Sequence, residues 1–267
     1  MAVNFKFKDK YDLYDLVHIT RILREPGGCP WDMEQTHTSI RENFLEETYE
    51  VIEAIDTNDR DLMQEELGDV LLQVTLHSDM ARTDGWFDID DVADGICKKL
   101  IIRHPHVFGD VTVGSTEDVL KNWDDIKRST KKQRSQSEAM AAIPATYPAL
   151  MKAQKVQEKA KKAGFDWRDF QGAFDKITEE TKELREALDS GDASAVEDEL
   201  GDVLFSVVNV ARFCNCNAET ALHKATAKFM KRYTITEALA AEKGIDMKTA
   251  PLSVLDELWA QAKEADK

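Results

Sequence analysis

Residues 65–74 read EELGDVLLQV and residues 198–207 read DELGDVLFSV, so one apolar and acidic pattern occurs twice in the chain. Before each copy lies a second matching pair, since residues 45–54 read LEETYEVIEA and residues 178–187 read TEETKELREA. The acids of both pairs share a single offset, because 183 − 50 = 133 and 199 − 66 = 133. Self-similarity at a fixed offset indicates internal repetition. The chain is therefore predicted to be a tandem duplication, with each copy occupying about half of its length.

The apolar residues within each copy have a helical period. Leu67, Val70, Leu71 and Val74 follow the i, i+3, i+4, i+7 pattern of one helix face. The stretch before them, 44–55, carries a wide apolar stripe, and residues 56–61 between the two are short, polar and rich in turn formers. This pattern predicts two antiparallel helices in each copy, with further helices over 92–103 and 218–243. The fold class is predicted to be all-α, with tandem duplicated helical-bundle domains.

Composition and charge limit the function classes. The chain has 267 residues, of which 42% are hydrophobic, and a formal net charge of −16. This charge disfavours nucleic acids and anionic membranes as partners, because such surfaces bind basic proteins. No apolar leader and no run of about 18 apolar residues occurs, so a cytoplasmic protein is expected.

A polar connector separates the two copies. Residues 128–138 read RSTKKQRSQSE, without a helical apolar period, and Pro144 and Pro148 follow. We expect an N-terminal domain over 1–128, a linker over 129–148 and a C-terminal domain over 149–267.

Acidic residues recur on the two predicted helices of each copy. An i, i+3 spacing places the two acids of a helix on one face, so four carboxylates converge where the helices oppose. The eight acids are Glu47, Glu50, Glu66 and Asp69 in the first copy and Glu180, Glu183, Glu199 and Asp202 in the second. Clustered carboxylates either resist ionisation or bind cations. An all-oxygen ligand set favours Mg²⁺, with Mn²⁺ as a substitute, over Zn²⁺ or Fe.

The alternative is that these acids form a solvated helix face. Exact recurrence of the acids argues against it. Gly68 and Gly201 also recur beside them in mid-helix, where glycine costs about 1 kcal/mol relative to alanine, and this predicts a close backbone approach. The Glu-x-x-His motif of di-iron bundles is absent, which disfavours oxygen chemistry.

Further motifs add a family resemblance. Residues 28–32 read GCPWD, residues 103–109 read RHPHVFG and residues 148–155 read PALMKAQK. Together with the doubled acids, they resemble the two-domain MazG nucleoside triphosphate pyrophosphohydrolases over nearly the whole chain. The resemblance implies an all-α homodimer that hydrolyses ribo- and deoxynucleoside triphosphates of broad base specificity to monophosphate and pyrophosphate with Mg²⁺. Its role would be nucleotide-pool housecleaning or regulation.

Other side chains are candidates for proton transfer and substrate binding. Glu46 and Glu179 lie beside the acid pairs without belonging to them and are predicted as general bases. Two i, i+4 cation pairs, Lys99 with Arg103 and Lys228 with Arg232, can bind phosphate oxygens. The resemblance assigns the second pair to the triphosphate. It also favours Trp259 as a nucleotide contact and Lys127 as a contribution across the dimer.

Three function classes stay open. The first is the broad pyrophosphohydrolase, the second is a narrower pyrophosphohydrolase of the same superfamily, and the third is a nucleotide-sensing regulator. Pyrophosphate release from a panel of nucleotides distinguishes them. We further expect the second copy to carry most of the turnover, because only that copy is followed by a long helix and the Trp259 segment.

Overall fold

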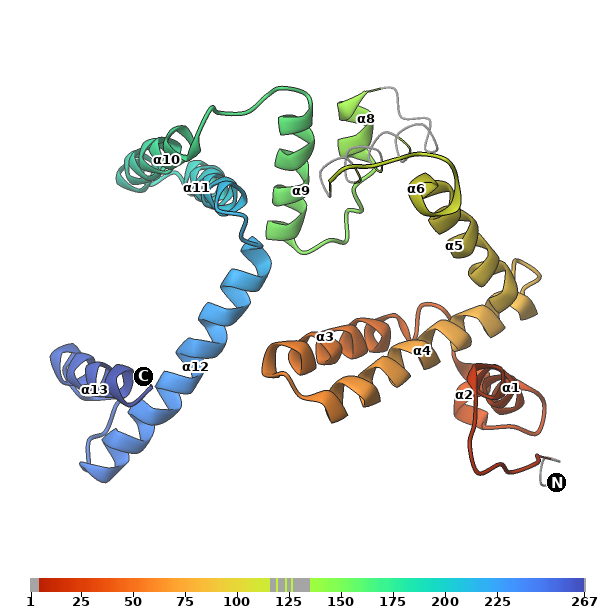
Figure 1. Ribbon diagram of the computed structural model, residues 1–267. Coiled ribbons are helices and arrows are strands. Elements are labelled where there is room, and N and C mark those ends of the chain that lie inside the picture. Colours follow the sequence, from red (N-terminus) through yellow and green to blue (C-terminus); the bar gives the residue numbers. More distant parts are fainter. Residues whose placement is uncertain (1–4, 116–118, 120–122, 124–125, 127–134, 267) are drawn as a thin grey trace. The chain divides into compact units, whose positions relative to one another are not determined.

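The computed structural model describes residues 5–115, 119, 123, 126 and 135–266, and these form helices and connecting loops without any β-strand (Figure 1). The predicted all-α fold is confirmed. The chain divides into two compact units, Met1–Thr130 and Lys131–Lys267. This boundary lies inside the segment predicted as a linker. Among the described residues, no helix combines the length and hydropathy needed to cross a membrane.

Unit 1 is organised around a hairpin of two long helices. The helices in its described part are α1 (Leu13–Arg24), α2 (Pro30–Glu34), α3 (Arg41–Thr57), α4 (Arg60–Thr83), α5 (Ile89–Arg103) and α6 (Pro105–Phe108). Helices α3 and α4 pack against each other, and α1 packs on α4. The hairpin predicted from the periodicity is therefore present.

The α3–α4 connection is shorter than residues 56–61, the segment predicted for it. Asn58 adopts a left-handed conformation (φ 55°) that ends α3. Asp59 then caps α4, because its carboxylate accepts hydrogen bonds from the backbone N–H of Asp61 and Leu62, each at 3.1 Å. Asn tolerates the left-handed region and Asp is a favoured N-cap, so two residues reverse the chain.

Unit 2 repeats this hairpin. Its helices are α8 (Gln136–Ala141), α9 (Ala149–Lys162), α10 (Phe170–Ser190), α11 (Ala193–Phe213), α12 (Ala218–Glu242) and α13 (Leu252–Ala265). Gly191 (φ 73°) ends α10 and the Asp192 side chain caps α11, so the two-residue reversal of unit 1 recurs. Helix α8 lies within the predicted linker 129–148 and packs on α9.

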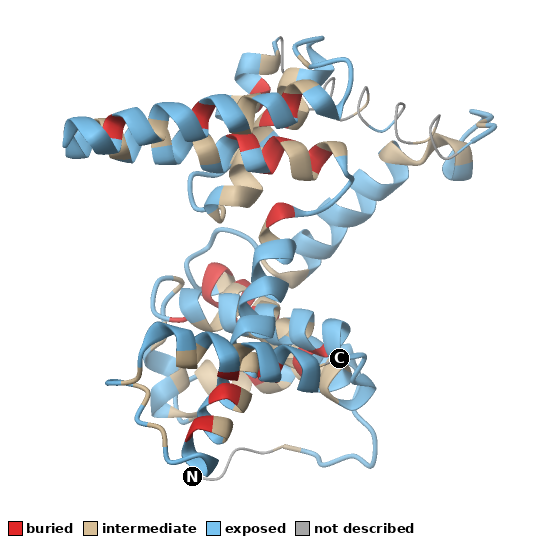
Figure 2. Ribbon diagram, turned by 90° about the vertical axis from the view of Figure 1, so that its left-hand side faces the viewer, coloured by how far each residue is buried: buried red, intermediate tan, exposed pale blue. Residues whose placement is uncertain are grey.

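The buried apolar core of the single chain is small (Figure 2). In unit 1 the buried cluster consists of Ile40, Leu76 and Met80, with Leu72 packed against it. Large apolar side chains lie exposed on other helices, among them Ile102 on α5 at 54% and Phe229 on α12 at 56%. Exposed apolar surface of this extent is typical of an interface.

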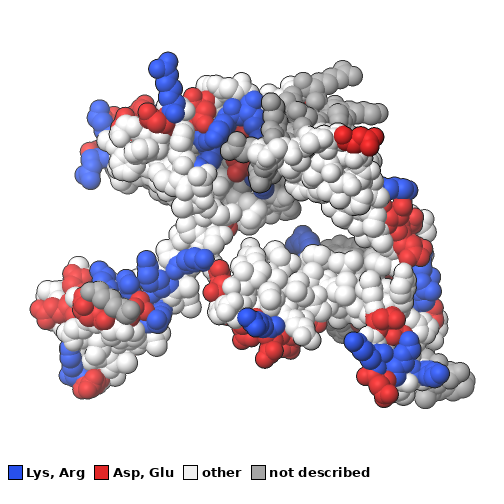
Figure 3. Space-filling model, in the orientation of Figure 1, with Lys and Arg blue, Asp and Glu red and all other residues white. Residues whose placement is uncertain are grey.

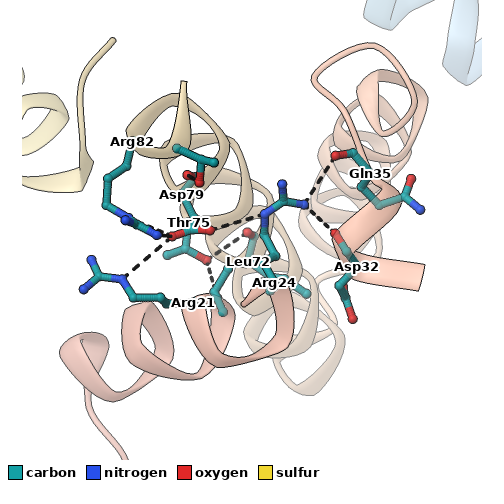
Figure 4. A network of polar contacts seen from close by, with 10 residues as sticks. Arg21, Arg24, Asp32, Gln35, Leu72, Thr75, Asp79 and Arg82 are labelled. Atoms are coloured by element: carbon teal, nitrogen blue, oxygen red, sulfur yellow. Dashed lines mark hydrogen bonds and ion pairs between the residues drawn. The ribbon is translucent and has the colours of Figure 1, made fainter. Parts of the chain in front are cut away.

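A buried carboxylate ties α1 and α2 to α4 in unit 1 (Figure 4). Asp79 of α4 is 8% exposed and forms ion pairs with Arg24 (3.3 Å), Arg82 (2.9 Å) and Arg21 (3.8 Å). Arg24 also donates from Nη1 to the backbone oxygens of Asp32 (2.5 Å) and Gln35 (3.4 Å). Asp79 therefore fixes α1 on α4, and Arg24 links both helices to the segment around α2.

Unit 2 has an arginine on α11 at the position where unit 1 has Asp79 on α4. The offset gives 212 − 79 = 133, and Arg212 of α11 is also 8% exposed. Its guanidinium donates to both carboxylate oxygens of Asp166, at 2.5 and 3.0 Å, and to Asn209. Although burial acts to raise it, the hydrogen bonds from Arg212 hold the pKa of Asp166 below its usual value. In each copy, a buried charge at the same position of the second hairpin helix pairs with a residue outside that helix, but the sign of the charge is opposite in the two copies.

Candidate metal centre

Three carboxylates of unit 2 converge between α10 and α11. Glu180, Glu199 and Asp202 each offer an oxygen, and these oxygens lie within 4.8 Å of one another. The antiparallel hairpin brings them together, because Glu180 lies on α10 and the other two lie one turn apart on α11. The predicted convergence of acids in the second copy is therefore present for three of the four residues.

The first copy shows the same arrangement. Glu47 of α3 meets Glu66 and Asp69 of α4, again with oxygens within 4.8 Å of one another. One acid of each cluster is deeply buried, Glu66 at 8% exposure and Glu180 at 4%. Because 66 and 180 are not related by the offset, the buried member comes from the second helix in one copy and from the first helix in the other.

The fourth predicted acid of each copy lies beside its cluster. Burial raises the pKa of Glu66, and the charge of Glu50 raises it further. In unit 2 the pKa of Glu183 is raised chiefly by a hydrogen bond with Glu180, then by burial. Glu50 and Glu183 therefore act electrostatically on the clusters without joining the groups of three.

Two acids of the first cluster, Glu47 and Glu66, have raised pKa values. Burial raises the pKa of Glu47, and the charges of Asp69 and Glu50 add to this effect. Raised pKa values mean that full ionisation of these acids is unfavourable without a compensating positive charge. A divalent cation bound by the acids would supply that charge.

The donor set fits a hard divalent ion. Both groups of three contain only carboxylates, without Cys or His. Glu199 Oε2 is buried and has no hydrogen-bond partner among the described residues, and an orphaned buried oxygen is costly unless something binds it. Oxygen-only ligation is the preference of Mg²⁺ and Mn²⁺.

A lysine that the sequence reasoning missed enters the second cluster. Lys176 Nζ lies 2.5 Å from Glu180 and 3.0 Å from Glu179. The hydrogen bonds with these two acids raise the pKa of Lys176 above its ordinary value. The signal for this contact was the i, i+3 and i, i+4 spacing of Lys176 to the two acids.

The predicted general bases lie at the edges of the clusters. The Glu179 side chain is 57% exposed, on the α10 turn that carries Glu180, and Glu46 is exposed next to Glu47 on α3. Neither is a member of a group of three.

The predicted phosphate-binding cations of unit 2 lie on another helix. Helix α12 meets α9, α11 and α13, and Figure 1 shows it leading away from the α10–α11 hairpin. Basic side chains gather along it, as Figure 3 shows. Arg232 is held by Asp266 at 2.7 Å, whereas Lys228 is exposed. The single chain therefore does not bring this pair to the acids of α10 and α11.

The remaining predicted substrate contacts lie on helices other than those that carry the acids. Trp259 of α13 packs on Phe229 of α12, with ring centroids 5.1 Å apart. Lys99 and Arg103 lie on α5, and Lys127 falls outside the described residues. The close backbone approach expected at Gly68 and Gly201 is wrong within the chain, because a Cβ at either glycine would meet nothing within 4 Å.

Both hairpins lie in segments of the chain that are similar to known proteins. The family model of the MazG nucleotide pyrophosphohydrolase domain matches residues 35–108 and 169–235. The chain is 47% identical over 253 residues to the nucleoside triphosphate pyrophosphohydrolase/pyrophosphatase MazG of Thermotoga maritima, covering 95% of this chain and 96% of that protein. It is 41% identical over 256 residues to the nucleoside triphosphate pyrophosphohydrolase of Escherichia coli K12, covering 94% and 97%. The uncharacterized protein YabN of Bacillus subtilis is 47% identical over 250 residues, which are 93% of this chain and 51% of YabN.

Proposed function

The chain belongs to the MazG nucleotide pyrophosphohydrolase family, and we propose that it hydrolyses nucleoside triphosphates to nucleoside monophosphate and pyrophosphate. The observation that carries this proposal is the convergence of three carboxylates in each copy at 4.8 Å or less. Both clusters lie inside the two segments that the family model matches. A triphosphate carries the same charge sign as this chain, so a cation between them is required for binding.

We assign Mg²⁺, with Mn²⁺ as a substitute, to these clusters. Glu180, Glu199 and Asp202 would hold the ion in unit 2, with Glu183 as a further ligand beside them, and Glu47, Glu66 and Asp69 would hold it in unit 1, with Glu50 beside them. When bound, the ion neutralises charge on the carboxylates and on phosphoryl oxygens. The orphaned Glu199 Oε2 supports this assignment, because a cation would satisfy it.

Water is the nucleophile of this hydrolysis, and a carboxylate must take its proton. Glu179 in unit 2 and Glu46 in unit 1 are suited to this role, since each lies beside the cluster and is exposed. An exposed position lets the residue pass its proton to solvent after attack. The acids of the cluster then hold their charge throughout the reaction.

We propose that a homodimer completes the substrate site. Lys228, Arg232 and Trp259 lie on the α12–α13 pair, which leads away from the α10–α11 hairpin of its own unit. Exposed apolar side chains on α12, such as Phe229 and Met230 at 64%, are surface that a second copy would bury. A second copy would thus bring cations to the triphosphate and an indole face to the base, and stacking without edge recognition suits broad base specificity. Such specificity fits nucleotide-pool housecleaning or regulation.

The test is a product assay on a nucleotide panel. The chain is incubated with Mg²⁺ and each ribo- and deoxynucleoside triphosphate, and monophosphate and pyrophosphate are quantified. We expect both products in equal amounts from most of the panel. Turnover of a single nucleotide would identify the narrower enzyme, and tight binding without products would identify a nucleotide-sensing regulator. Release of orthophosphate with the diphosphate would contradict the proposed reaction.

A further inference from the structure

The second acid cluster already contains a positive charge that belongs to the chain. Lys176 Nζ lies 2.5 Å from an oxygen of Glu180, a residue of the group of three, and 3.0 Å from Glu179. Glu180 is 4% exposed, whereas the Lys176 side chain is 35% exposed. The lysine therefore reaches from the surface to the buried carboxylate.

The described part of the first copy has no such cation. The offset gives 176 − 133 = 43, and residue 43 is Asn, which has no charge. Within the described part of unit 1, neither Glu47, Glu66 nor Asp69 pairs with a lysine or arginine. The two copies share their acids but differ in this one neighbour.

We propose that Lys176 is a tethered counter-ion that occupies the second cluster until a divalent cation displaces it, so that the two copies bind metal with different affinity. The proposal rests on the metal sites proposed above. An ammonium group and a divalent ion are both attracted to the Glu180 carboxylate, so the two positive charges compete for it. Asn43 imposes no such competition, so the first copy is the tighter metal site.

The partial exposure of Lys176 limits how far it can weaken metal binding. Solvent screens Lys176 once it leaves Glu180, so its release costs little more than an ordinary surface ion pair. We therefore expect the competition to weaken metal binding by roughly fivefold. An alternative is that Lys176 only stabilises α10 as an i, i+4 pair, in which case metal affinity does not depend on it.

The duplication offers a reciprocal exchange as the test. Mn²⁺ binding to the full chain is measured by electron paramagnetic resonance of the free ion, without nucleotide. Asp69→Asn removes the first cluster, so that the second is observed alone, and Asp202→Asn does the converse. In the first background, Lys176→Asn should tighten Mn²⁺ binding roughly fivefold, and in the second, Asn43→Lys should weaken it.

A matched control lies on the same helix. Lys182 forms an exposed i, i+4 pair with Glu186 at 3.4 Å, and Lys182→Asn should leave Mn²⁺ binding unchanged. Unchanged or weaker binding in Lys176→Asn, with the two backgrounds each losing one site, would overturn the counter-ion and leave the metal sites standing. If instead neither Asp69→Asn nor Asp202→Asn removes a site, the proposed metal centre itself is wrong.

Discussion

His37 and His77 lie ring against ring, with their Nδ1 atoms 2.7 Å apart. His77 belongs to α4, and His37 precedes α3 and also stacks with Trp86 at 5.4 Å between centroids. Burial lowers the pKa of His77, and the charge of His37 lowers it further. Protonation of His77 is therefore less favourable than that of a histidine in water.

The histidine pair predicts an acid-sensitive contact. A lowered pKa in the folded state means that the unfolded chain binds the proton more readily, so stability falls as the pH drops below about 6.5. The pKa of His77, followed by NMR titration, should lie below the ordinary histidine value of about 6.5. His77→Gln should lower the loss of stability between pH 7 and pH 5.5, and His223→Gln should leave it unaltered. An ordinary pKa for His77 would count against the contact.

Removal of the Asp79 charge should destabilise unit 1. Asp79→Asn leaves Arg21, Arg24 and Arg82 without their shared partner and should lower the free energy of unfolding by about 2–3 kcal/mol. The measurement is urea unfolding followed by circular dichroism. Asp84→Asn, at an exposed helix end nearby, should change it by less than about 0.5 kcal/mol. Equal effects of both substitutions would show that the network contributes nothing.

Loss of a metal ligand should abolish turnover in the second copy. Glu180→Gln, Glu183→Gln and Asp202→Asn each replace a carboxylate by a neutral amide, which is a poorer ligand for a hard cation. Initial rates at limiting Mg²⁺ measure the effect. Glu186→Gln, on the exposed face of α10, serves as the control and should keep activity. Full activity of the three variants at limiting Mg²⁺ would remove these acids from the ligand set.

The identity of the metal follows from the oxygen ligands. After chelation, activity should return with Mg²⁺ or Mn²⁺ and not with Zn²⁺ alone, because Zn²⁺ favours nitrogen and sulfur ligands. The measurement is pyrophosphate release after chelator removal and addition of one metal at a time. Complete rescue by Zn²⁺ alone would refute the hard-cation argument.

The two copies should divide the work unequally. Helix α12 has 25 residues and leads to α13 with Trp259, whereas α5 has 15 residues and leads to the four-residue α6. The second copy therefore offers more surface for a nucleoside, and productive binding needs the base as well as the metals. Glu183→Gln should remove most activity of the full chain, and Glu50→Gln should leave most of it. Rates on ATP and on one deoxynucleotide decide this, and equal losses would mean two working sites.

The hairpins and the acid clusters could be predicted from the sequence, because both depend on local spacing. Apolar residues at helical period define α4 and α11, and the i, i+3 acids must then share a face. Helix ends were less predictable. Two residues, Asn58 with Asp59, make a turn for which six were expected, because a left-handed cap and an N-cap can follow each other directly.

Contacts between distant segments could not be predicted in this way. Nothing in the spacing of Asp166 and Arg212 marks them as partners, since 46 residues separate them. Lys176 was overlooked for another reason: a lysine near acids on a helix is common, and only the burial of Glu180 makes this one significant. Likewise, the exposure of Phe229 reflects how the helices pack, which periodicity alone does not determine.

The opposite charges of Asp79 and Arg212 also bear on how the two halves of the gene can change. Recombination that copied the α4 segment into the place of α11 would set an aspartate beside Asp166, in place of the arginine that now pairs with it. The reverse exchange would set an arginine beside Arg21 and Arg24. Each half thus depends on the ion-pair partners within its own repeat, so gene conversion between the repeats would be selected against. The two sequences can therefore diverge while both retain their acids.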